Sequence, residues 1–371
     1  MRIGFDAKRA FFNKSGLGTY SRETISILSD FFPTNEYILY SPRPSKGKIF
    51  EKTDNLTVSY PQTFYYRTFS HLWRAYGLSG QLVKEKIDLY HGLSNELPMN
   101  IHQYPVKTVV TIHDLIFLRY PKLYGYYDRK NYEKKFRYAA QSANRVIAVS
   151  RQTANDLFEF FSIDEKKVDV VYQGCNPQFW QIVSEADKQG TASKYLIPEK
   201  FILSVGTIEK RKNILAVIKA MHQHKIFYPL VVVGRPTDYL DEIRNYIEEH
   251  NLNNIYFLHD VPIDDLPAFY QMAELFIYPS LFEGFGIPIV EALCSKVPVI
   301  TSKGGCFAEA GGKSSIYIDP YNIDEIGEAI KSVLNNNALR ISMISEGYNH
   351  VQQFRLENIA GNIMRTYEKI L

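Results

Sequence analysis

The sequence predicts an α/β protein made of two doubly wound domains, each a parallel sheet covered by helices. The chain has 371 residues, 45% of them hydrophobic, and chains beyond about 250–300 residues usually divide into domains. Short apolar, β-branched segments alternate with helical patterns along both halves, which favours parallel sheets. This alternation lapses once, near the middle of the chain, where we place the linker.

The expected elements follow in chain order. In the first half the expected strands include residues 2–5, 108–112, 145–149 and 168–172. In the second half they include 201–205, 230–233, 255–258, 275–278, 299–301 and 316–318. The linker is expected within about 174–200, because this stretch is irregular and polar. The first domain is therefore expected over residues 1–178 and the second over 179–353.

Composition narrows the class of protein. The formal net charge of +3 is too small to indicate nucleic acid by itself. Three cysteines, Cys175, Cys294 and Cys306, are odd in number and lack metal-ligand spacing, so we expect a reducing compartment and no disulfide framework. Since we find neither an apolar signal segment nor a membrane-spanning run, we expect a cytoplasmic protein.

Two acidic residues flank an expected helix start. Glu283 and Glu291 are eight residues apart, with Pro288 suited to the first helical position and Gly284 and Gly286 in the loop before it. Exposed amides at such a start attract phosphate. The carboxylates would repel phosphate and should instead face sugar hydroxyls, a combination that indicates a nucleotide sugar. Alternatively, acids here complement the helix dipole, which accounts for Glu291 better than for Glu283.

A basic turn follows the strand expected at 201–205. Lys210, Arg211 and Lys212 precede a helical pattern for which Asn213 is the expected N-cap. Three cations at a helix N-terminus oppose its dipole unless an anion is present. We therefore expect Arg211 and Lys212 to bind a diphosphate. A solvated basic turn is the alternative.

Two further segments follow strands of the first half. His113 ends the strand at 108–112 and could bond a sugar hydroxyl or phosphate, with Asp114 available to orient it or a nearby group, although such a histidine can be purely structural. Gly16 and Gly18 precede a helix and could present amides to phosphate, with a flexible loop as the alternative. This segment lacks a third glycine and lies about ten residues beyond its strand, which argues against an NAD enzyme.

Residues 119–137 combine basic and aromatic side chains. Only Asp128 and Glu133 are acidic in this run. Such a surface suits an anionic membrane face or a carbohydrate acceptor. A solvated helix with core-facing aromatic rings is the alternative, and no nucleic-acid-binding motif accompanies the run.

Together these motifs resemble the retaining glycosyltransferases of family 4, whose fold is the two-domain GT-B arrangement. The similar segments occur in family order and are Gly16 to Tyr20, Val110 to Asp114, Arg145 to Ser150, Val205 to Asn213 and Ser280 to Ala292. The Glu-x7-Glu block is the most specific of them. The resemblance implies two Rossmann-like domains facing across a cleft, an acceptor-side domain over 1–178 and a nucleotide-sugar-binding domain over 179–353. It also implies a C-terminal helix, about 354–371, that packs back on the first domain.

The resemblance also implies roles for individual residues. Glu283 would contact the donor sugar, Glu291 the ribose and Lys212 the diphosphate, while His113 would sit near the transferred sugar. Gly16 and Gly18 would close over the donor phosphates. Other implied donor-binding positions are Thr207, Arg211, Phe285, Gly286 and Ile287. No metal or cofactor is implied beyond the nucleotide sugar. Thr207 replaces an arginine that many relatives carry, so Arg211 would supply the second cation.

Residues 113–121 are most similar to the polysaccharide mannosyltransferase branch. This implies a retaining hexosyltransferase that moves mannose from GDP-mannose to a glycan or lipid-linked acceptor of a surface polysaccharide. A UDP-sugar donor, for glucosyl or N-acetylglucosaminyl transfer, is the alternative. A non-catalytic sugar-nucleotide-binding module is another, and the Glu-x7-Glu block disfavours an epimerase.

Overall fold

The computed structural model describes residues 1–13, 15–45, 50 and 54–371. The chain forms two compact units. Unit 1 comprises Met1–Gln173 together with Leu356–Leu371, and unit 2 comprises Gly174–Arg355. The domain boundaries expected after residues 178 and 353 differ from these limits by five and two residues.

Unit 1 contains a seven-stranded sheet in the order β3-β2-β1-β4-β5-β6-β7, in which every pair is parallel. Its strands are β1 (Arg2–Asp6), β2 (Glu36–Tyr40), β3 (Leu56–Ser59), β4 (Leu89–Gly92), β5 (Lys107–Ile112), β6 (Arg145–Ala148) and β7 (Val168–Val170). From β1 the chain adds β2 and β3 on one side of the sheet, and then adds β4 to β7 in order on the other side. The point at which the strand order reverses therefore lies between β1 and β4.

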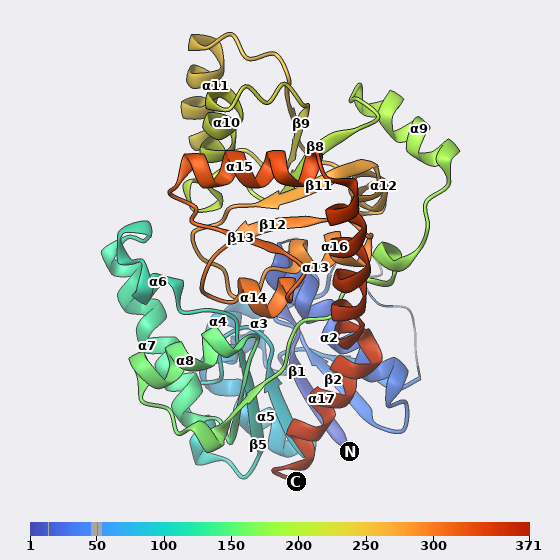
Figure 1. The fold of residues 1–371 in the computed structure, drawn as a ribbon. Helices are drawn as coiled ribbons and strands as arrows, with labels where there is room; N and C mark the ends of the chain where they lie inside the picture. Colours follow the sequence, from blue (N-terminus) through green and yellow to red (C-terminus); the bar gives the residue numbers. More distant parts are fainter. Residues whose placement is uncertain (14, 46–49, 51–53) are drawn as a thin grey trace. The chain divides into compact units, whose positions relative to one another are not determined.

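Helices bury both faces of this sheet (Figure 1). Its main helices are α1 (Lys8–Phe12), α2 (Gly16–Phe31), α3 (Phe64–Thr68), α4 (Ser70–Leu72), α5 (Leu78–Lys84), α6 (Ile116–Arg119), α7 (Tyr126–Ser142), α8 (Arg151–Phe161) and α17 (Leu356–Glu368). Along β2, Tyr37 and Leu39 join one core with α2 and α17, whereas Ile38 and Tyr40 join the other with α5, α7 and α8. This alternation is the period of a strand buried on both faces.

Unit 2 contains a six-stranded parallel sheet in the order β10-β9-β8-β11-β12-β13. Its strands are β8 (Phe201–Val205), β9 (Leu230–Val233), β10 (Ile255–Leu258), β11 (Ala273–Tyr278), β12 (Val299–Ser302) and β13 (Ile316–Ile318). Its helices are α9 (Glu185–Tyr195), α10 (Ile214–Gln223), α11 (Tyr239–Glu249), α12 (Leu266–Met272), α13 (Ile287–Cys294), α14 (Phe307–Gly311), α15 (Ile323–Leu334) and α16 (Asn337–His350). Here the strand order reverses between β8 and β11.

The α/β class with two doubly wound sheets is confirmed, and each expected strand coincides with an observed one. The linker prediction is wrong for residues 185–195, which form α9. This helix has an N-cap, because the Ser184 side chain accepts a hydrogen bond from the Asp187 N–H. Its sequence shows little helical periodicity because Ala192 is its one buried residue, so pattern alone could not reveal it.

No described helix is both long enough and apolar enough to cross a bilayer.

Candidate functional site

The residues expected to bind a nucleotide sugar in unit 2 lie where its strand order reverses. Gly206 and Thr207 follow β8, and the segment leading to Glu283 follows β11, which pairs with β8. Open α/β sheets bind ligands beyond the carboxyl ends of their strands at such a point. The turn after β8 is tightly packed, since a Cβ built on Gly234 would stand 1.8 Å from the Gly206 carbonyl oxygen.

Two cations converge on Glu283. Its Oε1 lies 2.6 Å from Lys212 Nζ and 2.7 Å from Arg211 Nη1. Glu209 completes the group, since its Oε1 accepts a 2.6 Å hydrogen bond from Arg211 Nη2. The Glu283 side chain is 12% exposed, against 35% for Glu209. We call these four residues the ion cluster.

The ion cluster keeps Glu283 ionised. Burial alone would raise the pKa of Glu283, but Lys212 and Arg211 outweigh burial and lower it to about 2. Burial lowers the pKa of Lys212, and the nearby Arg211 adds to this effect against the attraction of Glu283. Tyr278, at the end of β11, donates a 3.1 Å hydrogen bond to Glu283 Oε1 and lies under the Lys212 ammonium, 4.7 Å from ring centroid to Nζ.

Glu291 lies in a different environment. It is on α13, and its Oε2 accepts a 2.8 Å hydrogen bond from the Tyr270 hydroxyl. Burial raises the pKa of Glu291 to about 7, although the hydrogen bond from Tyr270 opposes the rise. The two glutamates of the Glu-x7-Glu block therefore differ in charge near neutral pH, because only Glu283 has cationic neighbours. Tyr270 and Tyr278 were not among the expected site residues, since tyrosines at strand and helix ends carry no motif.

The start of α13 matches the expected geometry to within one residue. Gly286, at the N-cap, has a φ of 110°, and Ile287 is the first helical residue, so Pro288 is second rather than first. The ring of Phe285 is 2% exposed and packs against Phe354, with ring centroids 5.4 Å apart. Any contact of Phe285 with a ligand must therefore involve its backbone.

The expected capping role of Asn213 at the start of α10 is wrong. Asn213 does precede the helix, but its side chain makes no capping hydrogen bond. Its Nδ2 instead donates to the Pro320 carbonyl oxygen at 2.7 Å. Asn213 has a φ of 57°, a conformation that asparagine tolerates better than most residues.

In unit 1, His113 is a buried, neutral residue just beyond β5. Its Nε2–H donates to the Leu93 carbonyl oxygen at 2.9 Å, which leaves Nδ1 as the acceptor nitrogen. Burial lowers the pKa of His113 to about 4. Asp114 Oδ1 accepts a 3.2 Å hydrogen bond from the Ile116 N–H at the start of α6. This contact shapes the turn after β5.

Gly16 and Gly18 lie within the first turn of α2, and not in a loop before it. A Cβ built on Gly18 would stand 1.9 Å from the Asn13 carbonyl oxygen, whereas one on Gly16 meets no atom of the described residues within 4 Å. Gly18 is therefore required by the close approach of backbone between α1 and α2. Gly16 has no such structural requirement.

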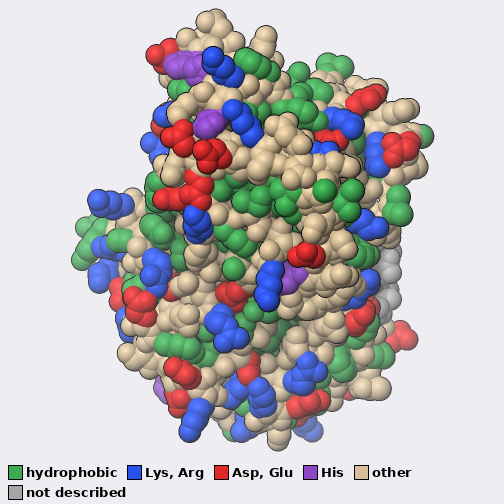
Figure 2. Space-filling model, in the orientation of Figure 1, with side chains coloured by type: hydrophobic (Ala, Val, Ile, Leu, Met, Phe, Trp, Pro, Cys, Tyr) green, Lys and Arg blue, Asp and Glu red, His purple; other side chains and the backbone are tan. Residues whose placement is uncertain are grey.

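The side chains of residues 119–137 support both interpretations of the basic-aromatic run, because some are paired or packed inward and others are exposed. Arg119 Nη2 lies 2.6 Å from Asp156 Oδ1 and 2.7 Å from Glu159 Oε2, so acids outside the run neutralise it. Tyr124, Tyr132 and Phe136 pack around Phe117 with ring centroids 5.3–6.3 Å away. In contrast, Leu123, Tyr126 and Tyr127 are 45%, 61% and 87% exposed. In Figure 2, basic and hydrophobic side chains gather on the lobe formed by α6 and α7.

Comparisons with known proteins match both halves of the chain. The model for glycosyltransferase family 4 matches residues 32–179, and that for glycosyl transferases group 1 matches residues 188–350. The O-antigen chain mannosyltransferase B of Escherichia coli is 28% identical over 287 residues, which is 76% of this chain and 74% of that protein.

A second relative is longer than this chain. The serotype-specific mannosyltransferase WbdA of Escherichia coli is 26% identical over 302 residues, 77% of this chain but only 36% of its own length. Among solved structures, HepE of Anabaena in complex with UDP and glucose has a TM-score of 0.73 at 18% identity, over all of both chains.

The family models together cover the segments that hold His113, the ion cluster and Glu291. The chain therefore belongs to glycosyltransferase family 4 and has the GT-B fold.

Proposed function

We propose that this glycosyltransferase moves mannose from GDP-mannose to a glycan or lipid-linked acceptor in the synthesis of a surface polysaccharide, with retention of anomeric configuration. The observation that carries the proposal is the ion cluster, in which two cations share one largely buried carboxylate at the carboxyl ends of β8 and β11. Mannosyl transfer is favoured by the names of the bacterial relatives, which are O-antigen and serotype-specific mannosyltransferases.

In this mechanism the ion cluster exchanges partners when the donor binds. Lys212 and Arg211 take the donor diphosphate and stabilise the negative charge that develops on it. Glu283, released from them, accepts hydrogen bonds from hydroxyls of the donor sugar. Glu291 holds the ribose, and the Nδ1 of His113 accepts a hydrogen bond from the transferred sugar.

In the transfer step the acceptor oxygen forms a bond to the anomeric carbon while the bond from that carbon to the diphosphate oxygen breaks. The acceptor hydroxyl gives its proton to the departing phosphate on the same face, which yields retention. The charge on the leaving group is met by Lys212, Arg211 and backbone amides at the start of α13. We therefore propose a metal-independent reaction, which predicts undiminished transfer in EDTA.

The donor base has a specific alternative, since HepE was solved with UDP and glucose. Calorimetric titration of the protein with GDP, UDP and ADP in metal-free buffer distinguishes the two donors. Binding of GDP in preference to UDP supports mannosyl transfer, whereas the reverse would replace the donor and leave the site assignment in place. Binding of no nucleotide would overturn the assignment of the ion cluster.

The role of Glu283 is tested with Glu283→Gln, using Glu209→Gln as the matched control. Both changes remove one carboxylate that contacts Arg211, but only Glu283 also holds Lys212. We expect Glu283→Gln to lower transfer at least a hundredfold while GDP binding is kept or strengthened, because a competing anion has left the cations. Equal transfer rates in the two variants would contradict the proposed role.

We also propose that the protein is cytoplasmic and contacts the anionic inner face of the membrane through α7 and the segment before it. The exposed Leu123, Tyr126 and Tyr127, beside exposed Lys122 and Lys130, suit a membrane interface. Sedimentation with vesicles containing 30% phosphatidylserine tests this. Binding that is lost in Tyr126→Ser/Tyr127→Ser supports the contact, and no binding by the wild type would refute it.

A further inference from the structure

Four buried polar side chains of unit 1 form a hydrogen-bonded network that the proposed function does not use. Tyr20 of α2 lies 3.0 Å from Thr111 of β5, measured between the hydroxyl oxygens. Thr111 Oγ1 lies 2.8 Å from Nε2 of His91 in β4, and His91 Nδ1 lies 2.6 Å from the hydroxyl of Tyr367 in α17. Each of the four is 6% exposed or less. We call them the tyrosine network.

One end of the tyrosine network packs against His113. The ring of Tyr20 lies at 90° to the imidazole of His113, with ring centroids 4.6 Å apart. Such an edge-to-face contact has a preferred geometry, because the edge of one ring is attracted to the face of the other. The orientation of Tyr20 therefore bears directly on the orientation of the imidazole.

The tyrosine network holds Tyr20 in one orientation because each of its contacts is directional. Burial lowers the pKa of His91 to about 3, and the nearby His113 adds to this effect, so His91 is neutral. A neutral imidazole donates from one nitrogen and accepts at the other, so its contacts with Thr111 and Tyr367 depend on the placement of the ring. Satisfied buried networks of this kind specify a single arrangement of the core. Apolar side chains would fill the same space without this constraint.

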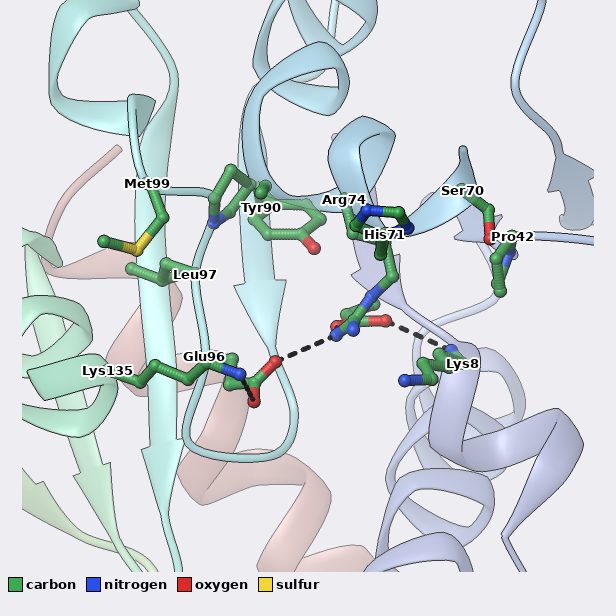
Figure 3. A pocket seen from close by; sticks show the side chains of 13 residues that line it. Lys8, Pro42, Ser70, His71, Arg74, Tyr90, Glu96, Leu97, Met99 and Lys135 are labelled. Atoms are coloured by element: carbon green, nitrogen blue, oxygen red, sulfur yellow. Dashed lines mark hydrogen bonds and ion pairs between the residues drawn. The ribbon is translucent and has the colours of Figure 1, made fainter. Parts of the chain in front are cut away.

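The segment after β4 holds His113 from its backbone and from Nε2. The His113 N–H donates to Asn95 Oδ1 at 2.8 Å, and the carbonyl that accepts from Nε2–H belongs to the same segment. Asn95 has a φ of 62°, a conformation that costs energy in residues other than glycine and that clusters at functional sites. In the pocket shown in Figure 3, the neighbouring Glu96 is held by Arg74 at 3.3 Å and by Lys135 at 3.4 Å, measured between nitrogen and oxygen. The segment is therefore fixed where it meets His113.

We propose that Tyr20 is a positioning residue for the transfer reaction: held by the tyrosine network, its ring fixes the tilt of the His113 imidazole and so aims Nδ1. The proposal rests on the proposed function, in which that nitrogen accepts a hydrogen bond from the transferred sugar. Aim matters because a misplacement of about 1 Å can slow an enzyme by roughly a hundredfold. Since Tyr367 is the far end of the tyrosine network, the packing of α17 within unit 1 contributes to the same positioning.

The test separates the ring of Tyr20 from its hydroxyl. Tyr20→Phe keeps the ring and removes the hydroxyl that meets Thr111, whereas Tyr20→Leu removes the ring as well. The matched control is Tyr37→Phe. Tyr37 is buried in the same core of unit 1, but its hydroxyl donates to the backbone carbonyls of Leu28 and Phe32, outside the tyrosine network.

Three quantities are measured on the full-length protein. The first is kcat and KM for hydrolysis of GDP-mannose and of UDP-glucose, in which water replaces the acceptor. The second is the affinity for GDP and UDP, from calorimetry. The third is the set of ring ¹⁵N resonances of His113 in protein labelled at its nine histidines, identified by their loss in His113→Ala.

We expect Tyr20→Phe to lower kcat about tenfold and Tyr20→Leu about a hundredfold, because the first loosens the ring and the second removes it. Nucleotide affinity should stay within about twofold of the wild type, since His113 contacts the sugar and not the nucleotide. The His113 resonances should shift in both variants. Tyr37→Phe should change neither kcat nor these resonances, although it too removes a buried hydroxyl.

A double-mutant cycle shows whether Tyr20 acts through His113. In the His113→Ala background, Tyr20→Phe should leave the residual kcat unchanged. An equal loss of kcat in both backgrounds would overturn the proposal, as would His113 resonances that Tyr20→Phe does not move. Tyr367→Phe changes the far end of the tyrosine network and should shift the same resonances, so it keeps the test valid if Tyr20→Phe does not fold. If the wild type hydrolysed neither donor, the proposed function would fail, and the resonances alone would decide on the positioning.

Discussion

Replacing Glu283 by glutamine should destabilise unit 2 by about 3 kcal/mol at pH 7. The value follows from the pKa of Glu283, which falls from 4.5 to about 2 in the folded protein, and from about 1.4 kcal/mol for each tenfold change in proton affinity. Glutamine keeps the size of the side chain but removes the charge that holds Lys212 and Arg211. The effect is thus electrostatic and not a loss of packing.

The pH dependence has a definite sign. A carboxyl with a depressed pKa contributes stability above its unfolded pKa and loses it as the pH falls through the folded value. The difference between wild type and Glu283→Gln should therefore be constant above about pH 4.5 and shrink as the pH falls toward 2.

The stability of unit 2 is measured by urea titration, followed by hydrogen-exchange mass spectrometry of peptides from β8 to α10. These peptides report the unfolding of unit 2 alone, which is necessary because the two units need not unfold together. Glu209→Gln is the control. Its carboxylate has one cationic partner and is 35% exposed, so its loss should cost less than about 1 kcal/mol. If Glu283→Gln cost no more than Glu209→Gln, our electrostatic account of the ion cluster would be wrong.

Three further changes test other parts of the structure. Burial raises the pKa of Glu291 to about 7, so the ionised carboxylate lowers the stability of the folded protein increasingly as the pH rises from about 4.5 to 7. Glu291→Gln should therefore be more stable than the wild type at pH 8 but not at pH 4, measured as denaturant midpoints. Gly18→Ala should lower the melting temperature, since its Cβ would overlap a backbone oxygen, whereas Gly16→Ala should not; equal melting temperatures would contradict this. Tyr367→Phe removes the 2.6 Å hydrogen bond to His91 Nδ1 and should lower the free energy of unfolding by about 1–3 kcal/mol. The loss is measured as faster hydrogen exchange in α17. Unchanged exchange would show that packing alone holds this helix.

The strands that the sequence predicted are those with continuous apolar runs, because a parallel strand covered on both faces must be apolar throughout. The strands not identified individually lack this signal or have it only in part. β4 contains His91 and Gly92, and β3 is only four residues long with two exposed side chains. Helix α9 was likewise not predicted, since it buries too little to show a helical period.

The class of fold, the family, and the placement of Arg211, Lys212, Glu283 and Glu291 beside helix starts could all be predicted from the sequence. These depend on local signals: apolar runs, glycines and charges at fixed spacing. Which charged side chains contact one another depends on the folded arrangement of the strands. Lys212 and Glu283 are 71 residues apart, and their contact exists because β8 and β11 are neighbours in the sheet. The tyrosine network likewise combines residues from α2, β4, β5 and α17. No local pattern encodes such groupings, because strand order places residues together irrespective of their distance in the chain.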